Sequence, residues 1–97
     1  MPKAVNPATA HTPALQDPKL LRLLDVLYST GSVTRASVAL GQSQPTVSIW
    51  LARARAQLGD PLFVRTADGM LPTPRAEALM PTVREVLGGL RRLSETS

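Results

Sequence analysis

Residues 30–59 of the chain read TGSVTRASVALGQSQPTVSIWLARARAQLG. Two segments of this stretch, 33–40 and 44–58, carry small and apolar residues at helical spacing, and only the sequence GQS separates them. A serine precedes each segment, at the position where a hydroxyl caps the free backbone N–H groups of a helix. Gly41 can take the left-handed conformation that ends many helices. Two helices joined by so short a turn predict a helix-turn-helix.

A further helix is predicted on the N-terminal side of this pair. Asp17 suits an N-cap, Pro18 suits the first helical position, and Gly31 ends the segment. The leucines between them recur at helical spacing: Leu20, Leu23, Leu24 and Leu27. Residues 1–16 contain prolines among small and polar residues, a composition that buries too little surface to fold. We therefore expect residues 1–16 to be a disordered tail.

The residues after the helix-turn-helix favour strands. The segment 62–66 is rich in β-forming residues, Ala67-Asp68-Gly69 favours a turn, and Met70-Leu71 precedes Pro72. This pattern predicts a small two-stranded wing. The fold class expected from the sequence is therefore mainly α, with a winged helix-turn-helix domain over residues 17–72.

The C-terminal segment 73–97 predicts one long helix, capped by Thr73 and opened by Pro74. Its apolar residues step by three and four alternately, as in a seam that pairs with another helix. They are Ala76, Leu79, Val83, Val86, Leu90 and Leu93. We expect a linker and dimerisation helix with Leu79, Val83, Val86 and Leu90 in the seam. Interruptions that predict a kink and fraying are Pro81, Gly88 and Gly89.

Composition narrows the class of protein. The chain has 97 residues, enough for one small domain, and a formal net charge of +4. Nine of its eleven basic residues are arginines, whose planar guanidinium suits phosphates and base edges, although charge alone leaves an ordinary basic surface open. The chain has no cysteine, no apolar run of about 18 residues and no signal core. We therefore expect a cytoplasmic protein.

The sequence offers no catalytic constellation. The single histidine, His11, lies in the predicted tail without acidic or cysteine partners at metal-ligand spacing. The carboxylates are scattered, so no nucleophile with a base and an orienting group is present. We predict no enzyme activity, no metal and no cofactor.

The helix at 44–58 has the two faces that a reader of the major groove needs. Away from its apolar stripe it is uncharged near the start and basic near the end. Gln44 has the amide that pairs with adenine, and Ser48 and Thr46 can bond to bases or phosphates. An ordinary solvated helix start is the alternative for Gln44 and Ser48. Trp50 is expected to pack against other helices, since duplex readers rarely stack on bases.

Four arginines are candidate phosphate contacts: Arg35, Arg53, Arg55 and Arg65. Arg65 lies on the predicted wing, from which it can reach a neighbouring backbone or minor groove. A salt bridge or a solvated charge is the alternative for Arg35 and Arg55. The full set of predicted DNA-binding residues is Thr34, Arg35, Ser43, Gln44, Pro45, Thr46, Ser48, Ile49, Arg53 and Arg65.

Four ordered blocks give a resemblance to a known family: TGSVTRAS (30–37), SQPTVS (43–48), LGDPLFVRT (58–66) and GMLPTPRA (69–76). From Leu20 to about Leu90 the chain resembles the N-terminal region of LysR-type transcriptional regulators. The resemblance implies DNA binding by the first three helices and the wing, and pairing of two subunits by the fourth helix. It further implies that the residues matching Gln44, Pro45, Ser48 and Arg65 contact DNA.

The resemblance also implies features outside these residues. In that family a C-terminal effector domain, absent here, binds a small-molecule inducer and completes a tetramer. Two departures stand out. Ile49 and Trp50 follow Ser48 where an arginine is common, so one DNA contact is missing, and Thr73-Pro74-Arg75-Ala76 replaces the commoner Thr-x-x-Gly.

The function expected from the sequence is therefore sequence-specific reading of an inverted-repeat operator in double-stranded DNA by a homodimer. Two-fold pairing predicts half-sites separated by whole helical turns, about 10 base pairs each. The rival hypothesis is a protein-interaction module whose basic residues are incidental. Salt separates the two, because DNA binding weakens steeply with salt and an apolar interface does not.

Overall fold

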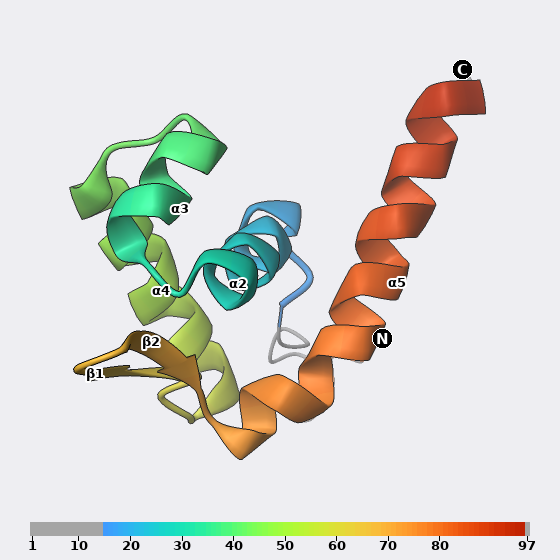
Figure 1. Cartoon of the computed structure of the whole chain (residues 1–97). Coiled ribbons are helices and arrows are strands. Elements are labelled where there is room, and N and C mark those ends of the chain that lie inside the picture. Colours follow the sequence, from blue (N-terminus) through green and yellow to red (C-terminus); the bar gives the residue numbers. More distant parts are fainter. Residues whose placement is uncertain (1–14, 97) are drawn as a thin grey trace, which may run out of the picture.

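The structure is a computed structural model that describes residues 15–96. In that range the chain forms four helices and a two-stranded antiparallel sheet. The elements are α2 (Pro18–Thr30), α3 (Val33–Leu40), α4 (Gln44–Leu58), β1 (Phe63–Thr66), β2 (Gly69–Pro72) and α5 (Pro74–Thr96). Figure 1 shows α2 in the centre, α3, α4 and the sheet on one side of it, and α5 leaving on the other. The predicted fold class is confirmed.

The helix starts lie where the sequence predicted them, because each is fixed by a local cap. The side chain of Asp17 accepts a hydrogen bond from the N–H of Lys19, at 2.9 Å. Ser32 caps α3 through the N–H of Arg35, at 3.1 Å, and Thr73 caps α5 in the same way. Each of the first three helices ends before a glycine, also as predicted.

The core is built around α2. The four leucines predicted for its buried side are at most 1% exposed, and Val47, Leu51 and Ala54 of α4 pack beneath them. Leu62 and Phe63, at the base of the sheet, complete this core. On α3, among the residues predicted to pack closely, only Ala36 is buried, while Val38 is 77% exposed. Val33 and Leu40 are partly buried against the core, and because α3 is covered on one side only, Val38 and Ala39 face outward.

The predicted tail 1–16 lies mostly outside the described residues. Leu15 is described, however, and is buried with 7% of its surface exposed. Its backbone N–H donates to the side-chain oxygen of Gln57 on α4, at 3.0 Å. Including Leu15 in a disordered tail was therefore wrong, because the side chain fills the core between α2 and α4.

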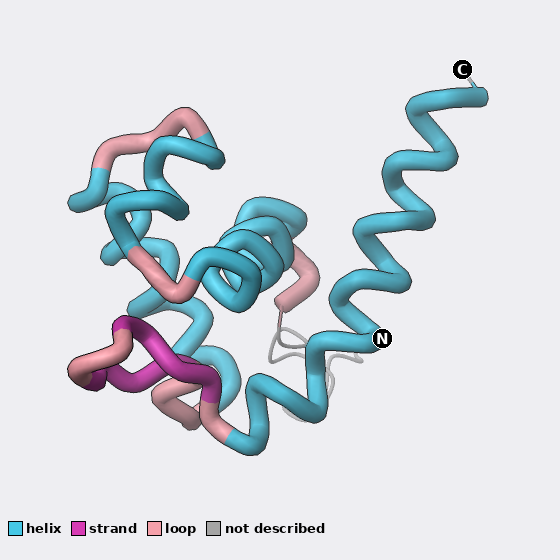
Figure 2. The backbone as a smooth tube through the Cα atoms, viewed as in Figure 1, coloured by secondary structure: helices cyan, strands magenta, loops and turns pink. Residues whose placement is uncertain are grey.

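The sheet differs from its prediction at three residues. β1 and β2 pair from Phe63 opposite Pro72 to Thr66 opposite Gly69, so the turn is shorter than predicted and both Gly69 and Pro72 belong to β2. Leu62 precedes the strand, fully buried and with a φ of 63°. Figure 2 shows the two strands of the hairpin, in magenta, beside the helices.

Asp60 closes the base of this hairpin. One of its carboxylate oxygens accepts hydrogen bonds from the Thr73 hydroxyl, at 2.7 Å, and from the Leu62 N–H, at 2.8 Å. These two bonds, that of Thr73 first, lower the pKa of Asp60 below its ordinary value. Asp60 thereby joins Leu62, the residue before β1, to Thr73, the N-cap of α5.

The residues predicted for the seam on α5 differ in how deeply they are buried. Val83 is only 4% exposed and lies in the chain's own core with Ala76, Met80 and Leu87. Val86, in contrast, is 42% exposed, and Leu79 and Leu90 are partly buried against the core. The seam prediction missed Met80 and Leu87, which widen the apolar stripe so that one edge packs on α2 and the other stays open.

The predicted fraying of α5 is not found: the helix continues through Pro81 and both glycines to Thr96. The division into residues 17–72 and 73–97 stays a prediction, although the first half of α5 shares the core of the preceding helices. Within residues 15–96, no helix combines the length and the apolar character needed to cross a membrane.

Candidate nucleic-acid interface

Three elements meet at a shallow hollow of ≈ 310 Å³: the start of α3, the start of α4 and the hairpin. Four of the predicted DNA-binding residues line it together, although they lie far apart in the sequence: Thr34, Gln44, Ser48 and Arg65. The rest of the lining is Gly31, Ser32, Val33, Gly69 and Met70. The structure therefore assembles a polar, basic-edged site from the residues that the sequence indicated.

Helix α4 presents its first turns outward beside this hollow. Gln44 and Ser48 are exposed and lie one turn apart on the same side of the helix. Pro45 and Ile49 form the neighbouring row, and Ile49 keeps 53% of its surface exposed. An exposed isoleucine here offers a methyl surface to a partner, at the position where the sequence lacks an arginine.

Ser43 and Thr46 hold the helix start. The Ser43 hydroxyl accepts the Thr46 N–H at 3.2 Å and donates to the Thr46 hydroxyl at 3.0 Å. Neither residue lines the hollow. Their contact with DNA stays a prediction, and their observed task is to keep the first turn of α4 in place.

The arginines divide into two groups. Arg65 on β1 and Arg35 on α3 are exposed, and Arg65 borders the hollow. Arg55, a candidate phosphate contact for which a surface bond was the alternative, bonds to the chain's own backbone. Its guanidinium donates to the carbonyl of Pro61 at 2.7 Å and to that of Phe63 at 2.8 Å. Arg55 therefore ties the end of α4 to the start of the hairpin.

The opposite side of α4 packs against the start of α2. Trp50 is partly buried against the core, as predicted, and the ammonium of Lys19 lies 6.0 Å from its ring centroid. Lys19, through its backbone N–H first and its side chain second, lowers the pKa of Asp17, and the charge of Arg53 adds to this shift. Arg53 thus lies toward α2, and the structure does not bring it to the hollow with Arg65.

A backbone contact fixes where the hairpin stands. The N–H of Met70 donates to the carbonyl oxygen of Gly31, in the turn between α2 and α3, at 2.9 Å. Gly69 has a φ of +106°, and a Cβ placed on it would lie 2.6 Å from that same oxygen. Sequence reasoning missed this approach, since no local pattern joins residues so far apart along the chain.

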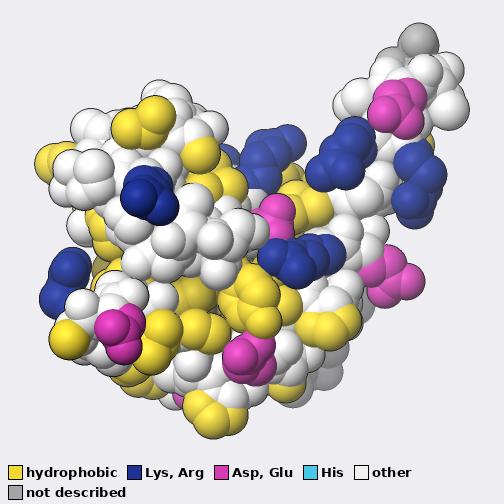
Figure 3. Space-filling view, viewed as in Figure 1, with side chains coloured by type: hydrophobic (Ala, Val, Ile, Leu, Met, Phe, Trp, Pro, Cys, Tyr) yellow, Lys and Arg dark blue, Asp and Glu magenta, His cyan; other side chains and the backbone are white. Residues whose placement is uncertain are grey.

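Charge is distributed around the hollow. On the face shown in Figure 3, lysines and arginines gather along α5, and single basic side chains lie over α3 and beside the hairpin. The side chains at the start of α4 are uncharged. Among residues 15–96 no group of three or more His, Cys, Asp or Glu is placed to hold a metal ion, and His11 lies outside that range.

Comparison with known sequences places this geometry in a family. Residues 18–77 match the family described as bacterial regulatory helix-turn-helix protein, lysR family. The HTH-type transcriptional regulator LinR of Sphingobium indicum is 52% identical over 75 residues, which are 77% of this chain and 25% of LinR. Nodulation protein D 2 of Sinorhizobium fredii is 45% identical over 71 residues, 73% of this chain and 23% of that protein. The chain spans about a quarter of the length of these relatives.

Solved structures agree. A probable transcriptional regulator from Pseudomonas aeruginosa superposes with a TM-score of 0.75 at 38% identity, over 78% of this chain and 26% of its own. The CbnR_DBD-DNA complex superposes with a TM-score of 0.75 at 22% sequence identity, over 84% of this chain and 93% of its own. The BenM_DBD/benA site 1 DNA complex superposes with a TM-score of 0.76 at 20% sequence identity, over 84% of this chain and 91% of its own. At these identities the last two establish the fold.

Proposed function

Because the chain belongs to the LysR family of bacterial regulatory helix-turn-helix proteins, we propose that it reads an inverted-repeat operator in double-stranded DNA as a dimer. Family membership confirms the resemblance seen in the four sequence blocks, and the prediction of a regulator that is not an enzyme is confirmed with it. The neighbouring structures that contain DNA support duplex DNA as the partner. The observation that carries the proposal is the meeting of Thr34, Gln44, Ser48 and Arg65 at one hollow.

The geometry supports base contacts by the start of α4 and backbone contacts by the hairpin. The start of α4 enters the major groove, where the Gln44 amide pairs with an adenine and Ser48 bonds to a base or phosphate. Pro45 and Ile49 offer apolar contact to thymine methyl groups. Arg65, at the edge of the hollow, reaches the backbone or the adjacent minor groove. Arg35 and Arg53 remain candidate phosphate contacts outside the hollow.

The dimer forms through the open edge of α5. Leu79, Val86 and Leu93 recur on this edge, and Leu93 is 67% exposed. An apolar hollow of ≈ 580 Å³ continues it onto α2 and α4, lined by Leu15, Gln16, Leu21, Leu58, Leu79, Thr82, Val83 and Val86. A second copy seated here buries this surface, while Val83 mainly supports the chain's own core. Two-fold pairing of the copies then gives an inverted-repeat site.

This chain covers only 25% of LinR, so relatives have ample length for an effector domain. By resemblance, we infer that such a domain binds a small-molecule inducer and completes a tetramer, in the cytoplasm. None of the residues described above is assigned to that task.

The test is fluorescence anisotropy with a labelled inverted-repeat duplex from upstream of the chain's own gene, against a scrambled duplex, at several salt concentrations. We expect tighter binding to the repeat and a steep fall of affinity with salt. Equal and weak binding to both duplexes at all salts would contradict the proposal and favour a protein-interaction module.

Gln44→Ala should cost on the order of 1–3 kcal/mol of binding free energy and relax the preference at one base pair, because it removes the adenine-pairing amide. The measurement is affinity for duplexes that differ at each operator position. Gln57→Ala is the matched control, since Gln57 lies at the other end of α4 and bonds to Leu15. An equal loss for Gln44→Ala on operator and scrambled DNA would remove Gln44 from base readout.

Arg65→Ala should weaken binding to all sequences by a similar factor and reduce the slope of log affinity against log salt by about one, because one phosphate contact is lost. The readout is the salt titration described above. Arg22→Ala removes an exposed arginine of α2 that does not line the hollow. If Arg65→Ala and Arg22→Ala change the slope equally, Arg65 makes no specific contact with a phosphate.

A further inference from the structure

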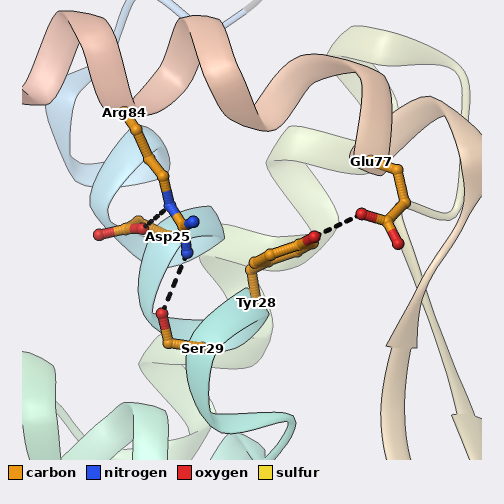
Figure 4. Close-up of polar contacts among 5 residues, drawn as sticks. All are labelled: Asp25, Tyr28, Ser29, Glu77 and Arg84. Atoms are coloured by element: carbon orange, nitrogen blue, oxygen red, sulfur yellow. Dashed lines mark hydrogen bonds and ion pairs between the residues drawn. The ribbon is translucent and has the colours of Figure 1, made fainter.

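A polar cluster joins α2 to α5 on the side away from the hollow (Figure 4). The guanidinium of Arg84 donates to a carboxylate oxygen of Asp25 at 2.8 Å and to the hydroxyl of Ser29 at 3.3 Å. It also lies 4.9 Å from the ring centroid of Tyr28, whose hydroxyl donates to the carboxylate of Glu77. We call these five residues, Asp25, Tyr28, Ser29, Glu77 and Arg84, the α2–α5 strap.

The strap holds α5 at two points. Glu77 lies in the first turn of α5 and Arg84 about two turns later, so both reach α2 from the same side of the helix. A helix fixed at one point can still swing, whereas two fixed points set its direction. The strap therefore defines the angle between α5 and the rest of the molecule.

The apolar contacts beneath the strap do not set that angle as well. Ala76, Met80, Val83 and Leu87 pack α5 on the core, but apolar burial is not directional. Met80 is also flexible enough to fill gaps of different shape. Hydrogen bonds lose strength steeply when their geometry changes, so the strap responds to small rotations that the apolar contacts tolerate.

A small change in the angle between α5 and the rest of the molecule causes a large displacement, because α5 is long. Helix α5 has 23 residues, and the described molecule extends 49 Å along its longest axis, with α4 and the C-terminal end of α5 on opposite sides (Figure 1). A rotation of about 10° over such a length moves one end by about 8 Å, roughly two base-pair steps of B-DNA. The angle therefore decides how far apart two recognition helices stand in a dimer that pairs through α5.

We propose that the α2–α5 strap sets the spacing of the two operator half-sites, with Arg84 and Glu77 as positioning residues that touch no DNA. The inference rests on the proposed function, in which α5 forms the dimer and α4 reads the groove. It adds a determinant of specificity on the opposite side of the molecule from the bases. A half-site is then recognised through Gln44 and its neighbours, and the distance between half-sites through the strap.

The exposure of the strap makes this role testable apart from folding. The side chains of Asp25 and Arg84 are 33% and 49% exposed, so losing their ion pair should change stability little. The variants are Arg84→Ala, which removes one point of attachment, and Tyr28→Phe, which removes the other and keeps the ring. Arg91→Ala is the control, because Arg91 is an exposed arginine of α5 with no bond to another helix among residues 15–96.

The experiment selects bound DNA from a duplex pool with a long random centre and compares the enriched sequences. We expect the unaltered chain and Arg91→Ala to enrich one half-site sequence in pairs at one spacing. Arg84→Ala and Tyr28→Phe should enrich the same half-site over a wider range of spacings than the unaltered chain does. A single unchanged spacing in both strap variants overturns the inference and leaves the proposed function intact. If the unaltered chain enriches no paired half-sites, the proposed function fails and the inference fails with it.

A second measurement examines the angle without DNA. The chain has no cysteine, so Gln42→Cys and Glu95→Cys allow spin labels to be placed at the turn before α4 and near the end of α5. Labelled chains diluted with unlabelled chains report only the distance within one chain. We expect a narrow distance distribution that Arg84→Ala broadens and Arg91→Ala leaves unchanged. An equally narrow distribution in Arg84→Ala overturns the role of the strap.

Discussion

Gly69→Ala is expected to lower the free energy of unfolding by about 2–4 kcal/mol, because backbone strain and overpacking add at this position. Its φ of +106° is unfavourable for alanine, and the new methyl would lie 2.6 Å from the carbonyl oxygen of Gly31. That oxygen belongs to the backbone and already accepts the N–H of Met70, so it has no room to move. The hairpin must therefore shift away from the turn between α2 and α3.

Urea unfolding followed by the fluorescence of Trp50, the single tryptophan, measures this loss. Gly41→Ala is the matched control, since Gly41 also has a positive φ, of +66°, but no atom lies within 4 Å of its Cβ position. It should cost only the strain, about 1–2 kcal/mol. Arg65 moves with the hairpin, so Gly69→Ala should weaken DNA binding as well. Equal losses in Gly69→Ala and Gly41→Ala would show that the close approach to the Gly31 carbonyl oxygen does not add to the loss of stability.

Val86→Glu is expected to abolish dimerisation and to reduce affinity for a paired site by about 10²-fold or more, since binding of the second half-site loses its effective concentration. Val86 is 42% exposed in the single chain, so the substitution leaves the core intact. In the proposed dimer the same position is covered, and burying an unpaired carboxylate there is costly. Affinity for a single half-site should stay unchanged.

Sedimentation gives the oligomeric state of Val86→Glu, and anisotropy on single and paired half-sites gives the affinities. Ala78→Glu adds the same charge at an exposed position of α5 outside the apolar edge and should behave like the unaltered chain. Val83→Glu should instead unfold the protein, because Val83 is 4% exposed in its own core. A Val86→Glu dimer with undiminished affinity would place the interface elsewhere.

The difference between Val83 and Val86 shows where sequence reasoning reached its limit. Helix starts were predictable because a cap is local: Asp17 and Ser32 each bond within the next few residues. The buried and open faces of α5 could not be predicted in this way, because an apolar stripe does not show which of its edges packs on the chain's own core. Met80 and Leu87 are buried and therefore mark the edge that packs on the core. Both were missed because the other apolar residues of α5 already recur at steps of three and four without them.

The candidate site shows the same limit. Gln44, Ser48 and Arg65 were indicated by residue type and by position on a helix or hairpin, and the structure places them at one hollow. Arg55 has the same chemistry as Arg65 and was also a candidate phosphate contact, with a salt bridge or a solvated charge as the alternative, yet it bonds to Pro61 and Phe63. Which arginine is free depends on carbonyl groups that only the folded backbone brings near. Leu15 likewise joins the core through a contact with Gln57 that no local pattern announces.

The exposed row at the start of α4 has an evolutionary consequence. Within residues 15–96 the side chains of Gln44, Ser48 and Ile49 make no bond that holds the fold, whereas neighbouring Ser43 and Thr46 do. Exposed substitutions of this kind usually change stability by no more than about 0.5 kcal/mol. In the proposed function these positions read the bases, so after a gene duplication one copy can change its DNA site by altering them, without first acquiring compensating changes elsewhere in the domain.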